Sequence, residues 1–151
     1  MIIQEDSRQQ AGKHEIKHAC WAAAGDLVFR SKVIVGDYCK PPAVAVDTKE
    51  GMHEIAQNIG GTKTEHNRFI NELKLARDLG TKLFILIENE DGIRNISDVR
   101  RWINPRMEYS PQAIQGERLA KAMTTIESRY GCSFMFCRPE ETADLIKRLL
   151  A

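Results

Sequence analysis

The sequence of 151 residues lacks several features that would place it in a special class of protein. No apolar run approaches the roughly 18 residues of a transmembrane helix, so we expect no membrane partner. No basic segment followed by an apolar one opens the chain, so we expect no secretory signal. The four cysteines include no Cys-x-x-Cys pair. We interpret them as reduced thiols of a cytoplasmic protein, and not as a disulfide framework or a zinc site.

A strong charge of either sign is also missing. Lys and Arg number 22 against 21 Asp and Glu, which gives a net charge of +1. Bulk charge therefore does not indicate a nucleic-acid-binding protein, and any basic surface must be local. The chain shows no internal repeat, no low-complexity tract and no long linker, so residues 1–151 are expected to form a single domain.

Hydrophobic periodicity predicts a chain of mixed helices and strands. Helical periods cover residues 12–24, 51–59, 64–79, 96–103, 116–130 and 140–150, and strand-like runs cover 2–5, 27–29, 32–35, 43–47, 82–88 and 133–137. The short connections within 27–47 favour antiparallel pairing, and the apolar run 82–88 is typical of a central strand covered on both faces. We expect an α/β architecture, a central mixed β-sheet flanked by helices.

In the first predicted helix an apolar face is formed by Ile16, Ala19, Cys20 and Ala23. Trp21 and Trp102 are interpreted as core or interface anchors. The apolar stripes of the helices at 116–130 and 140–150 also indicate core packing.

Two aspartates and a lysine form the most informative pattern. Asp37 follows Gly36 at a turn, and Asp47-Thr48-Lys49 begins ten residues later on the next predicted strand. Residues two apart on a strand point to one face, so Asp47 and Lys49 share a surface. If the flanking strands form a hairpin, Asp37 reaches the same surface. Two carboxylates and an ammonium group then converge beside one strand.

Such a group of side chains suits metal-assisted phosphodiester hydrolysis. Carboxylate oxygens bind a hard cation such as Mg²⁺ or Mn²⁺, and the metal activates a bound water molecule. A lysine nearby can orient that water or stabilise developing charge. The same pattern also fits a solvated strand end with a structural ion pair, because Asp-x-Lys is common by chance.

Further motifs resemble those of the ERCC4-type (XPF/Mus81-like) nuclease domains, a family of the PD-(D/E)xK restriction-endonuclease-like superfamily. The matching segments occur in the family's order: Asp6-Ser7-Arg8, Val35-Gly36-Asp37-Tyr38, Val46-Asp47-Thr48-Lys49 and Leu86-Ile87-Glu88. Tyr130-Gly131 before the last strand and Glu141-Thr142-Ala143 after it are also similar, so the resemblance covers most of the chain. It implies a restriction-endonuclease-like fold and a metal-dependent endonuclease acting on branched or flapped DNA.

The resemblance also implies roles for individual residues. Asp37 and Asp47 would be metal ligands, Lys49 would act at the attacking water, and Asp6 would be a further acidic group at the edge of the site. The chain departs from the family within the acidic-x-Lys motif, where Thr48 replaces an arginine and Asp47 replaces a glutamate. The shorter acid is compatible with metal chemistry, whereas the lost arginine concerns substrate preference.

Candidate DNA contacts are Arg8, Lys63 and Arg68. Lys63 and Arg68 follow a glycine pair in a flexible, basic segment, for which an ordinary helix-entry turn is the alternative. Arginines at 94, 100, 101 and 106 can add sequence-independent affinity for phosphate, although each singly is better explained by a solvated surface.

The histidines allow two readings each. His14 and His18 lie four residues apart and could both reach a metal, but a solvated helix face explains them better because no third ligand is evident. His53 stands where the family has an aspartate, with Glu54 beside it. It could contact the scissile phosphate or the metal shell, and a capping or surface role is the simpler interpretation.

The leading prediction is therefore a cytoplasmic, DNA-associated endonuclease that uses Mg²⁺ or Mn²⁺. The alternative is a non-catalytic DNA-binding or partner subunit that keeps the nuclease fold, and a plain α/β interaction domain is a third, weaker reading. No helix-hairpin-helix module follows the nuclease region, so the chain resembles a stand-alone nuclease domain of bacterial or phage type, with a role in DNA repair expected. Family members pair through the C-terminal part of the domain, which predicts a homodimer through the C-terminal helices.

Overall fold

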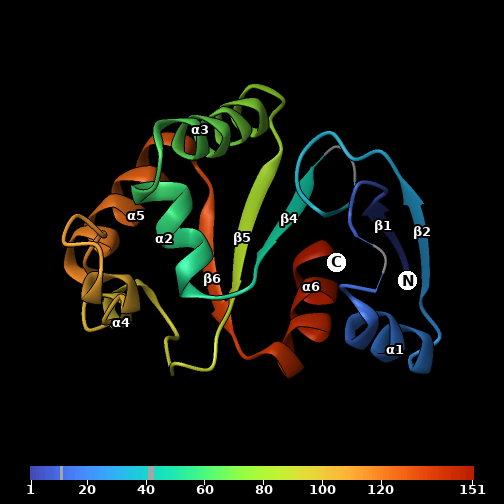
Figure 1. The fold of residues 1–151 in the computed structure, drawn as a ribbon. Helices are drawn as coiled ribbons and strands as arrows, with labels where there is room; N and C mark the ends of the chain where they lie inside the picture. Colours follow the sequence, from blue (N-terminus) through green and yellow to red (C-terminus); the bar gives the residue numbers. More distant parts are fainter. Residues whose placement is uncertain (11, 41–42) are drawn as a thin grey trace.

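A computed structural model describes residues 1–10, 12–40 and 43–151 (Figure 1). A six-stranded sheet with the order β2-β1-β3-β4-β5-β6 forms its centre. The strands are β1 (Ile2–Asp6), β2 (Leu27–Ser31), β3 (Tyr38–Lys40), β4 (Val44–Lys49), β5 (Lys82–Glu88) and β6 (Ser133–Cys137). Pro41 and Pro42, which the sequence places between two strands, lie outside the described residues.

Strand directions make the sheet mixed, as predicted. β3 runs antiparallel to both β1 and β4, whereas β4, β5 and β6 are mutually parallel. The prediction of antiparallel pairing is right for β3 but wrong for β2, which pairs in parallel with β1. A helix lies between β1 and β2 in the chain and provides the crossover that a parallel pair requires.

The strand predicted at residues 32–35 is not formed. Val33 and Val35 are buried and alternate with exposed neighbours, which explains the strand-like pattern. Side chains satisfy this backbone in place of a neighbouring strand: Arg8 Nη2 donates to the Val33 carbonyl at 2.7 Å, and Asp6 Oδ1 accepts from the Val33 amide at 3.4 Å. Tyr38, which the sequence assigns to a break, instead begins β3.

Helices cover both faces of the sheet. They are α1 (Glu15–Ala23), α2 (Met52–Gly60), α3 (Lys63–Asp78), α4 (Ile96–Val99), α5 (Gly116–Tyr130) and α6 (Thr142–Leu150), with short 3₁₀ turns at Pro105–Glu108 and Pro139–Glu141. α4 ends well before residue 103, so the predicted helix at 96–103 is only partly formed. None of these helices, within the part of the chain that the structure describes, is long and apolar enough to span a membrane.

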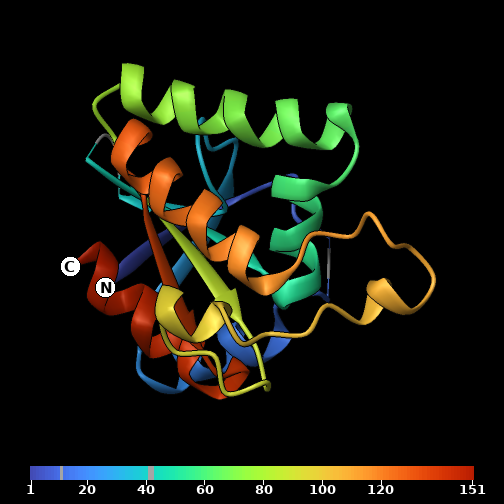
Figure 2. The same cartoon turned by 90° about the vertical axis from the view of Figure 1, so that its left-hand side faces the viewer.

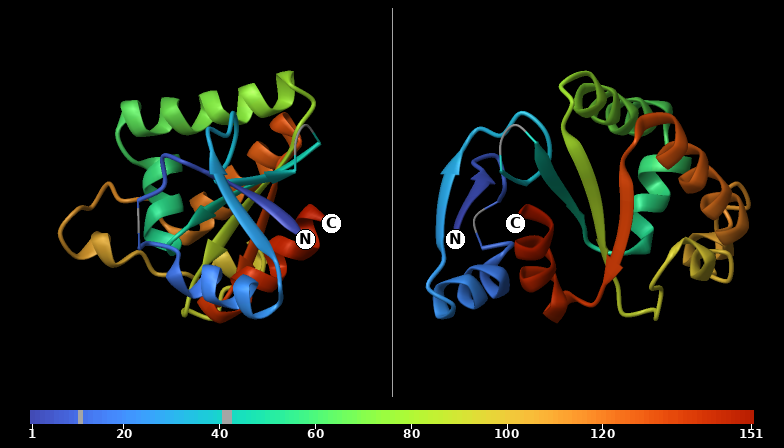
Figure 3. Two further views of the ribbon diagram at one scale, coloured as in Figure 1. Left: turned by 90° about the vertical axis from the view of Figure 1, so that its right-hand side faces the viewer. Right: turned by 180° about the vertical axis from the view of Figure 1, so that it is seen from behind.

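Two hydrophobic cores pack between the sheet and the helices that cover its two faces. Figures 2 and 3 show how these helices lie on either side of the sheet. One core joins α2, α3 and α5 to the sheet, and the other joins α1 and α6 to its opposite face. In β5, Leu86 belongs to the second core and Ile87 to the first, and both are fully buried. β5 is therefore a central strand covered on both faces, as the apolar run predicts.

α1 is oriented differently from the prediction. Ile16 is 67% exposed, and Ala19, Cys20 and Ala23 are also exposed. The buried face instead carries His14, Lys17 and Trp21. Trp21 Nε1 donates to the Ala143 carbonyl at 3.1 Å, which joins α1 to α6. Polar residues face inward here because Glu88 pairs with Lys17 and Gln9 contacts His14.

Candidate functional site

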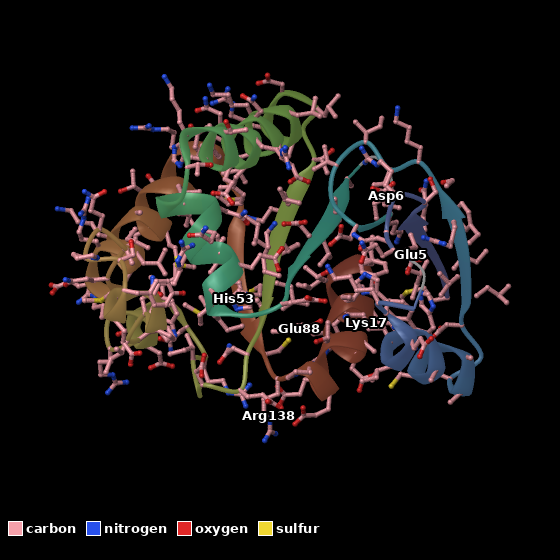
Figure 4. All side chains as sticks on the ribbon, viewed as in Figure 1. Glu5, Asp6, Lys17, His53, Glu88 and Arg138 are labelled. Atoms are coloured by element: carbon pink, nitrogen blue, oxygen red, sulfur yellow. The ribbon has the colours of Figure 1, made fainter. Side chains whose placement is uncertain are left out.

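A cavity of about 230 Å³ opens at the carboxyl end of β4, between α1 and the start of α2. Its lining is almost wholly polar: Gln9, Lys13, His14, Lys17, Asp37, Asp47, Thr48, Lys49, Glu50, Glu54 and Glu88. In Figure 4, Lys17 and Glu88 mark its location at the lower end of the sheet. The three residues that the sequence singles out, Asp37, Asp47 and Lys49, all line this one cavity.

Asp37 is delivered by a tight turn before β3. Gly36 has a φ of 78°, and a Cβ at this position would lie 2.9 Å from the Val46 carbonyl oxygen. Glycine is therefore required, and the Asp37 amide can donate to Val46 O at 2.8 Å. Asp37 Oδ2 accepts hydrogen bonds from the amide and hydroxyl of Thr48, each at 2.8 Å. The β3–β4 hairpin thus carries Asp37 across to the Asp47-Thr48-Lys49 strand, although its first strand is β3 and not the predicted strand at 32–35.

Asp47 and Lys49 share one face of β4, as their spacing predicts. Lys49 Nζ lies 2.8 Å from Asp47 Oδ2, and both side chains are only 10% exposed. The ammonium group also lies 5.7 Å from the centre of the Phe69 ring, on α3. An opposite charge and an aromatic face therefore fix the position of this lysine at the edge of the cavity.

Burial shifts the proton equilibria of these groups. Burial first, and then the negative charge of Asp47, raises the pKa of Asp37 to about 7. For Lys49, burial alone lowers the pKa, but the Asp47 carboxylate outweighs it and leaves the pKa above its usual value. Lys49 therefore stays protonated at neutral pH, whereas Asp37 titrates near neutrality.

Glu72 of α3 is an acidic neighbour that sequence reasoning missed. Its Oε1 accepts from the Gly36 amide at 3.0 Å, one residue before Asp37. Burial and the charge of Asp47 raise the pKa of Glu72 to about 7. The sequence pattern could have indicated an inward-facing acid here, because Glu72 falls on the same face of the helix as the buried Phe69, Leu73 and Ala76.

A second group that the sequence did not predict comes from α1 and the loop before it. Lys17 Nζ pairs with Glu88 Oε1 at 2.7 Å and closes one wall of the cavity. Gln9 donates to Asp37 Oδ1, and its own Oε1 contacts His14 Nε2 at 2.7 Å. The interpretation of His14 as part of a solvated face is therefore wrong. Burial, reinforced by Lys17, lowers the pKa of His14.

Other predicted residues lie outside the cavity. The Asp6 carboxylate pairs with Arg8 Nε at 2.8 Å, and only its backbone amide approaches the site, by donating to the Asp37 carbonyl at 2.7 Å. Figure 4 shows Asp6 on β1, away from Lys17 and Glu88. Lys63 and Arg68 are exposed on α3 and do not line this cavity.

His53 and His18 lie in different surroundings, and neither lines the small cavity that holds the aspartates. His53 lines a neighbouring cavity of about 850 Å³, together with Glu50 and Glu88, while Glu54 faces the smaller cavity that holds the aspartates. His18 Nε2 contacts the buried Glu5 carboxylate at 2.5 Å and is partly exposed.

The donor set of the small cavity fits a hard divalent cation. Asp37 and Asp47 supply carboxylate oxygens whose mutual repulsion a cation would relieve, as the raised pKa of Asp37 indicates. Among the described residues no three His, Cys, Asp or Glu side chains are gathered so that they could hold a metal by themselves. Mg²⁺ commonly takes one or two carboxylates and completes its shell with water and substrate phosphate, so two aspartates suffice.

Comparison with known proteins identifies the fold. No protein-family model matches the sequence, and no curated protein matches it. Among solved structures, XPF from Aeropyrum pernix superposes with a TM-score of 0.68 at 17% identity, covering 99% of this chain and 60% of that one. A DNA complex of XPF from Aeropyrum pernix gives 0.66 at 18% identity, covering 99% and 62%. The chain thus spans about three fifths of these neighbours and has an α/β restriction-endonuclease-like fold.

Proposed function

We propose that this protein is a metal-dependent DNA endonuclease, with branched or flapped DNA as its preferred substrate. The observation that carries the proposal is the convergence of Asp37, Asp47 and Lys49 in one polar cavity. XPF structures as neighbours, one of them a complex with DNA, support a DNA-processing role. The proposed role in DNA repair rests on the sequence resemblance alone, and the proposed cytoplasmic location rests on the interpretation of the cysteines as reduced thiols.

In this proposal Asp37 and Asp47 hold Mg²⁺ or Mn²⁺, which when bound lowers the pKa of a water molecule and screens phosphate charge. Lys49 remains protonated beside Asp47 and faces the negative charge that develops on the phosphate as the water oxygen attacks. The attacking water would lose a proton to the solvent, the bond from phosphorus to the leaving oxygen would break as the bond to the water oxygen forms, and the leaving oxygen would take up a proton from the solvent. Thr48 fixes the orientation of the Asp37 carboxylate through two hydrogen bonds.

Arg8, Lys63 and Arg68 are the proposed contacts to the DNA backbone. All three lie outside the cavity with exposed or largely exposed side chains, as expected of residues that reach along a substrate. Contacts of this kind supply affinity independent of sequence and make binding fall with salt. Asp6 would act indirectly, by holding Arg8.

A homodimer through the C-terminal helices remains part of the proposal. The apolar stripes of α5 and α6 are buried in two different cores on opposite faces of the sheet. Because the two helices lie on opposite faces, a single flat dimer interface would use the outer surface of only one of them.

A non-catalytic DNA-binding or partner subunit is the second candidate, and one observation favours it. The carboxylates of the proposed metal site already have protein partners: Asp37 is hydrogen-bonded to Gln9 and Thr48, and Asp47 forms an ion pair with Lys49, although Asp47 Oδ2 accepts no hydrogen bond from the residues that the structure describes. Metal binding would have to displace some of these contacts. A site held by such contacts is also compatible with a purely structural role.

A cleavage assay separates the two candidates. End-labelled duplex, flap and single-stranded DNA would be incubated with Mn²⁺ and the wild type, Asp47→Ala, or the control Asp144→Ala, whose aspartate is exposed on α6. We expect cleavage by the wild type and the control that is lost in EDTA and in Asp47→Ala. DNA binding without cleavage of any substrate would overturn the nuclease in favour of the non-catalytic subunit.

A further inference from the structure

A groove of about 560 Å³ lies between α3 and α5, at the other end of α2 from the candidate active site. Figure 2 shows these two helices side by side on the same face of the sheet. Ile59 and Gly60 at the end of α2 line the groove, whereas Glu54 near the start of α2 lines the small cavity. None of the residues that line this groove also lines that cavity.

The floor of the groove is apolar. Ile70 of α3, Ile114 before α5, and Ala122 and Tyr130 of α5 are partly buried and pack against the first core without being covered by it. A concave apolar surface of this kind can bind anchoring side chains of another molecule, because removing apolar surface from water is favourable.

The rim of the groove is cationic. Arg118, Lys121 and Arg129 project from α5 with exposed side chains, and His66 of α3 faces them across the groove. No carboxylate is among the residues that line the groove. The three α5 cations form no ion pair with any residue that the structure describes, so their charges are free to meet a partner.

We propose that the α3–α5 groove binds a segment of a partner protein that combines acidic residues with apolar anchors. The anchors would occupy the floor between Ile70 and Ala122, and the carboxylates would meet the unpaired cations of α5. This interaction is separate from DNA cleavage, because it uses neither Asp37, Asp47 nor Lys49.

Two other occupants fit less well. The phosphates of a duplex would pair with Arg118, Lys121 and Arg129 but would leave the apolar floor uncovered. A second copy of the chain docked across a two-fold axis at this groove would bring the same cationic rim against itself. Charge complementarity therefore favours an acidic protein segment over both.

The test begins with a displayed library of random 16-residue peptides selected on the intact protein. Enriched peptides would be synthesised with a fluorescent label, and their affinities measured by anisotropy. Arg118→Glu/Arg129→Glu reverses the rim charge, and Thr125→Trp fills the groove at an exposed lining position without changing charge. Arg148→Glu is the matched control, since Arg148 is exposed on α6 over the opposite face of the sheet and has no ion pair among the described residues.

We expect enriched peptides to carry Asp or Glu around large apolar residues. Their affinity should fall at least about tenfold in both groove variants and remain unchanged in Arg148→Glu. Circular dichroism melts would establish that each variant folds. Failure to enrich such peptides, or affinities that the groove variants leave unchanged, would overturn the proposal.

Two further outcomes would replace it. If Arg118→Glu/Arg129→Glu weakens binding of duplex DNA while Thr125→Trp does not, and no peptide competes, the groove is a phosphate contact. If the wild type is a dimer by light scattering and both groove variants are monomers, the groove is a contact between two copies. If the protein proves not to be a nuclease, the peptide-binding and light-scattering results would still test the groove proposal.

Discussion

At the scale of single residues, the candidate site depends on how Asp37 balances opposing influences. Two hydrogen bonds from Thr48 favour its charged form, whereas burial and the nearby Asp47 carboxylate oppose it more strongly. The result is a carboxyl group whose pKa is about 7. A cation placed between the two aspartates would reverse this balance, which links the electrostatics of the site to metal binding.

The raised pKa of Asp37 predicts a pH-dependent stability difference. Its folded value is about 7 against an ordinary 3.8, so the folded state binds the proton more tightly and loses stability as pH rises through that window. Asp37→Asn removes the charge. We expect the free energy of unfolding of the variant to rise relative to that of the wild type as the pH increases from about 4 to 7. The gain should be about 1–3 kcal/mol at pH 8 without metal.

Denaturant unfolding of both proteins across this pH range measures the effect. Glu72→Gln serves as a second case, because burial and the charge of Asp47 also raise the pKa of Glu72 to about 7. A stability difference that does not change with pH would contradict the assigned electrostatics of Asp37.

Lys49 gives a prediction about rate. Lys49→Met removes the ammonium group that would face developing charge in the proposed reaction, and we expect single-turnover cleavage to fall about 10²- to 10³-fold. DNA affinity should change by no more than about threefold, since one buried cation contributes little to backbone contact. Lys74→Met, at an exposed position of α3, is the control. Equal losses in binding and cleavage would show that Lys49 holds substrate and does not act in the chemical step.

At the scale of elements, α1 connects the site to the second core. Trp21 is 1% exposed, stacks edge-on against Tyr38 with ring centres 5.3 Å apart, and donates to α6. Lys17, one turn earlier, pairs with Glu88 of β5. The same helix face therefore anchors the fold and forms a wall of the cavity.

Trp21→Ala should therefore cost about 3–5 kcal/mol of unfolding free energy, because it leaves a large cavity between α1 and α6. Ile16→Ala on the exposed face of the same helix should change stability by less than about 0.5 kcal/mol. Equilibrium urea unfolding of the two variants compares the faces directly. The opposite ranking would mean that α1 packs on its apolar face, as the sequence alone suggests.

The errors of sequence reasoning at this scale share a cause. Periodicity located β5 and most helices because their apolar residues are contiguous or regularly spaced. It failed for α1 because Lys17 and His14 acquire partners from β5 and from the preceding loop, which no local pattern shows. It failed for residues 32–35 because Arg8 and Asp6 satisfy that backbone in place of a neighbouring strand.

At the scale of the whole molecule, sequence distance determined which site residues could be predicted. Asp37 directly precedes β3, and Asp47 and Lys49 lie on β4, which pairs with β3. Their nearness in sequence allowed the convergence to be predicted, although the first strand of the expected hairpin, at 32–35, is not formed. Three other residues reach the same region from segments that are distant in sequence from this hairpin: Gln9 from a loop, Lys17 from α1 and Glu72 from α3. Only the folded sheet, in the order β2-β1-β3-β4-β5-β6, brings these elements together.

The account stands on the claim that the Asp37–Asp47 pair binds a divalent cation, and calorimetric titration of Mn²⁺ tests it most directly. Wild type, Asp37→Asn/Asp47→Asn and the control Asp144→Asn would be titrated at pH 8, alone and with a flap duplex that carries a phosphorothioate at the junction. We predict one site in the wild type and the control, tightened by DNA and weakened at least about tenfold in the double variant. Unchanged binding in the double variant, or no binding by the wild type with DNA, would contradict the account.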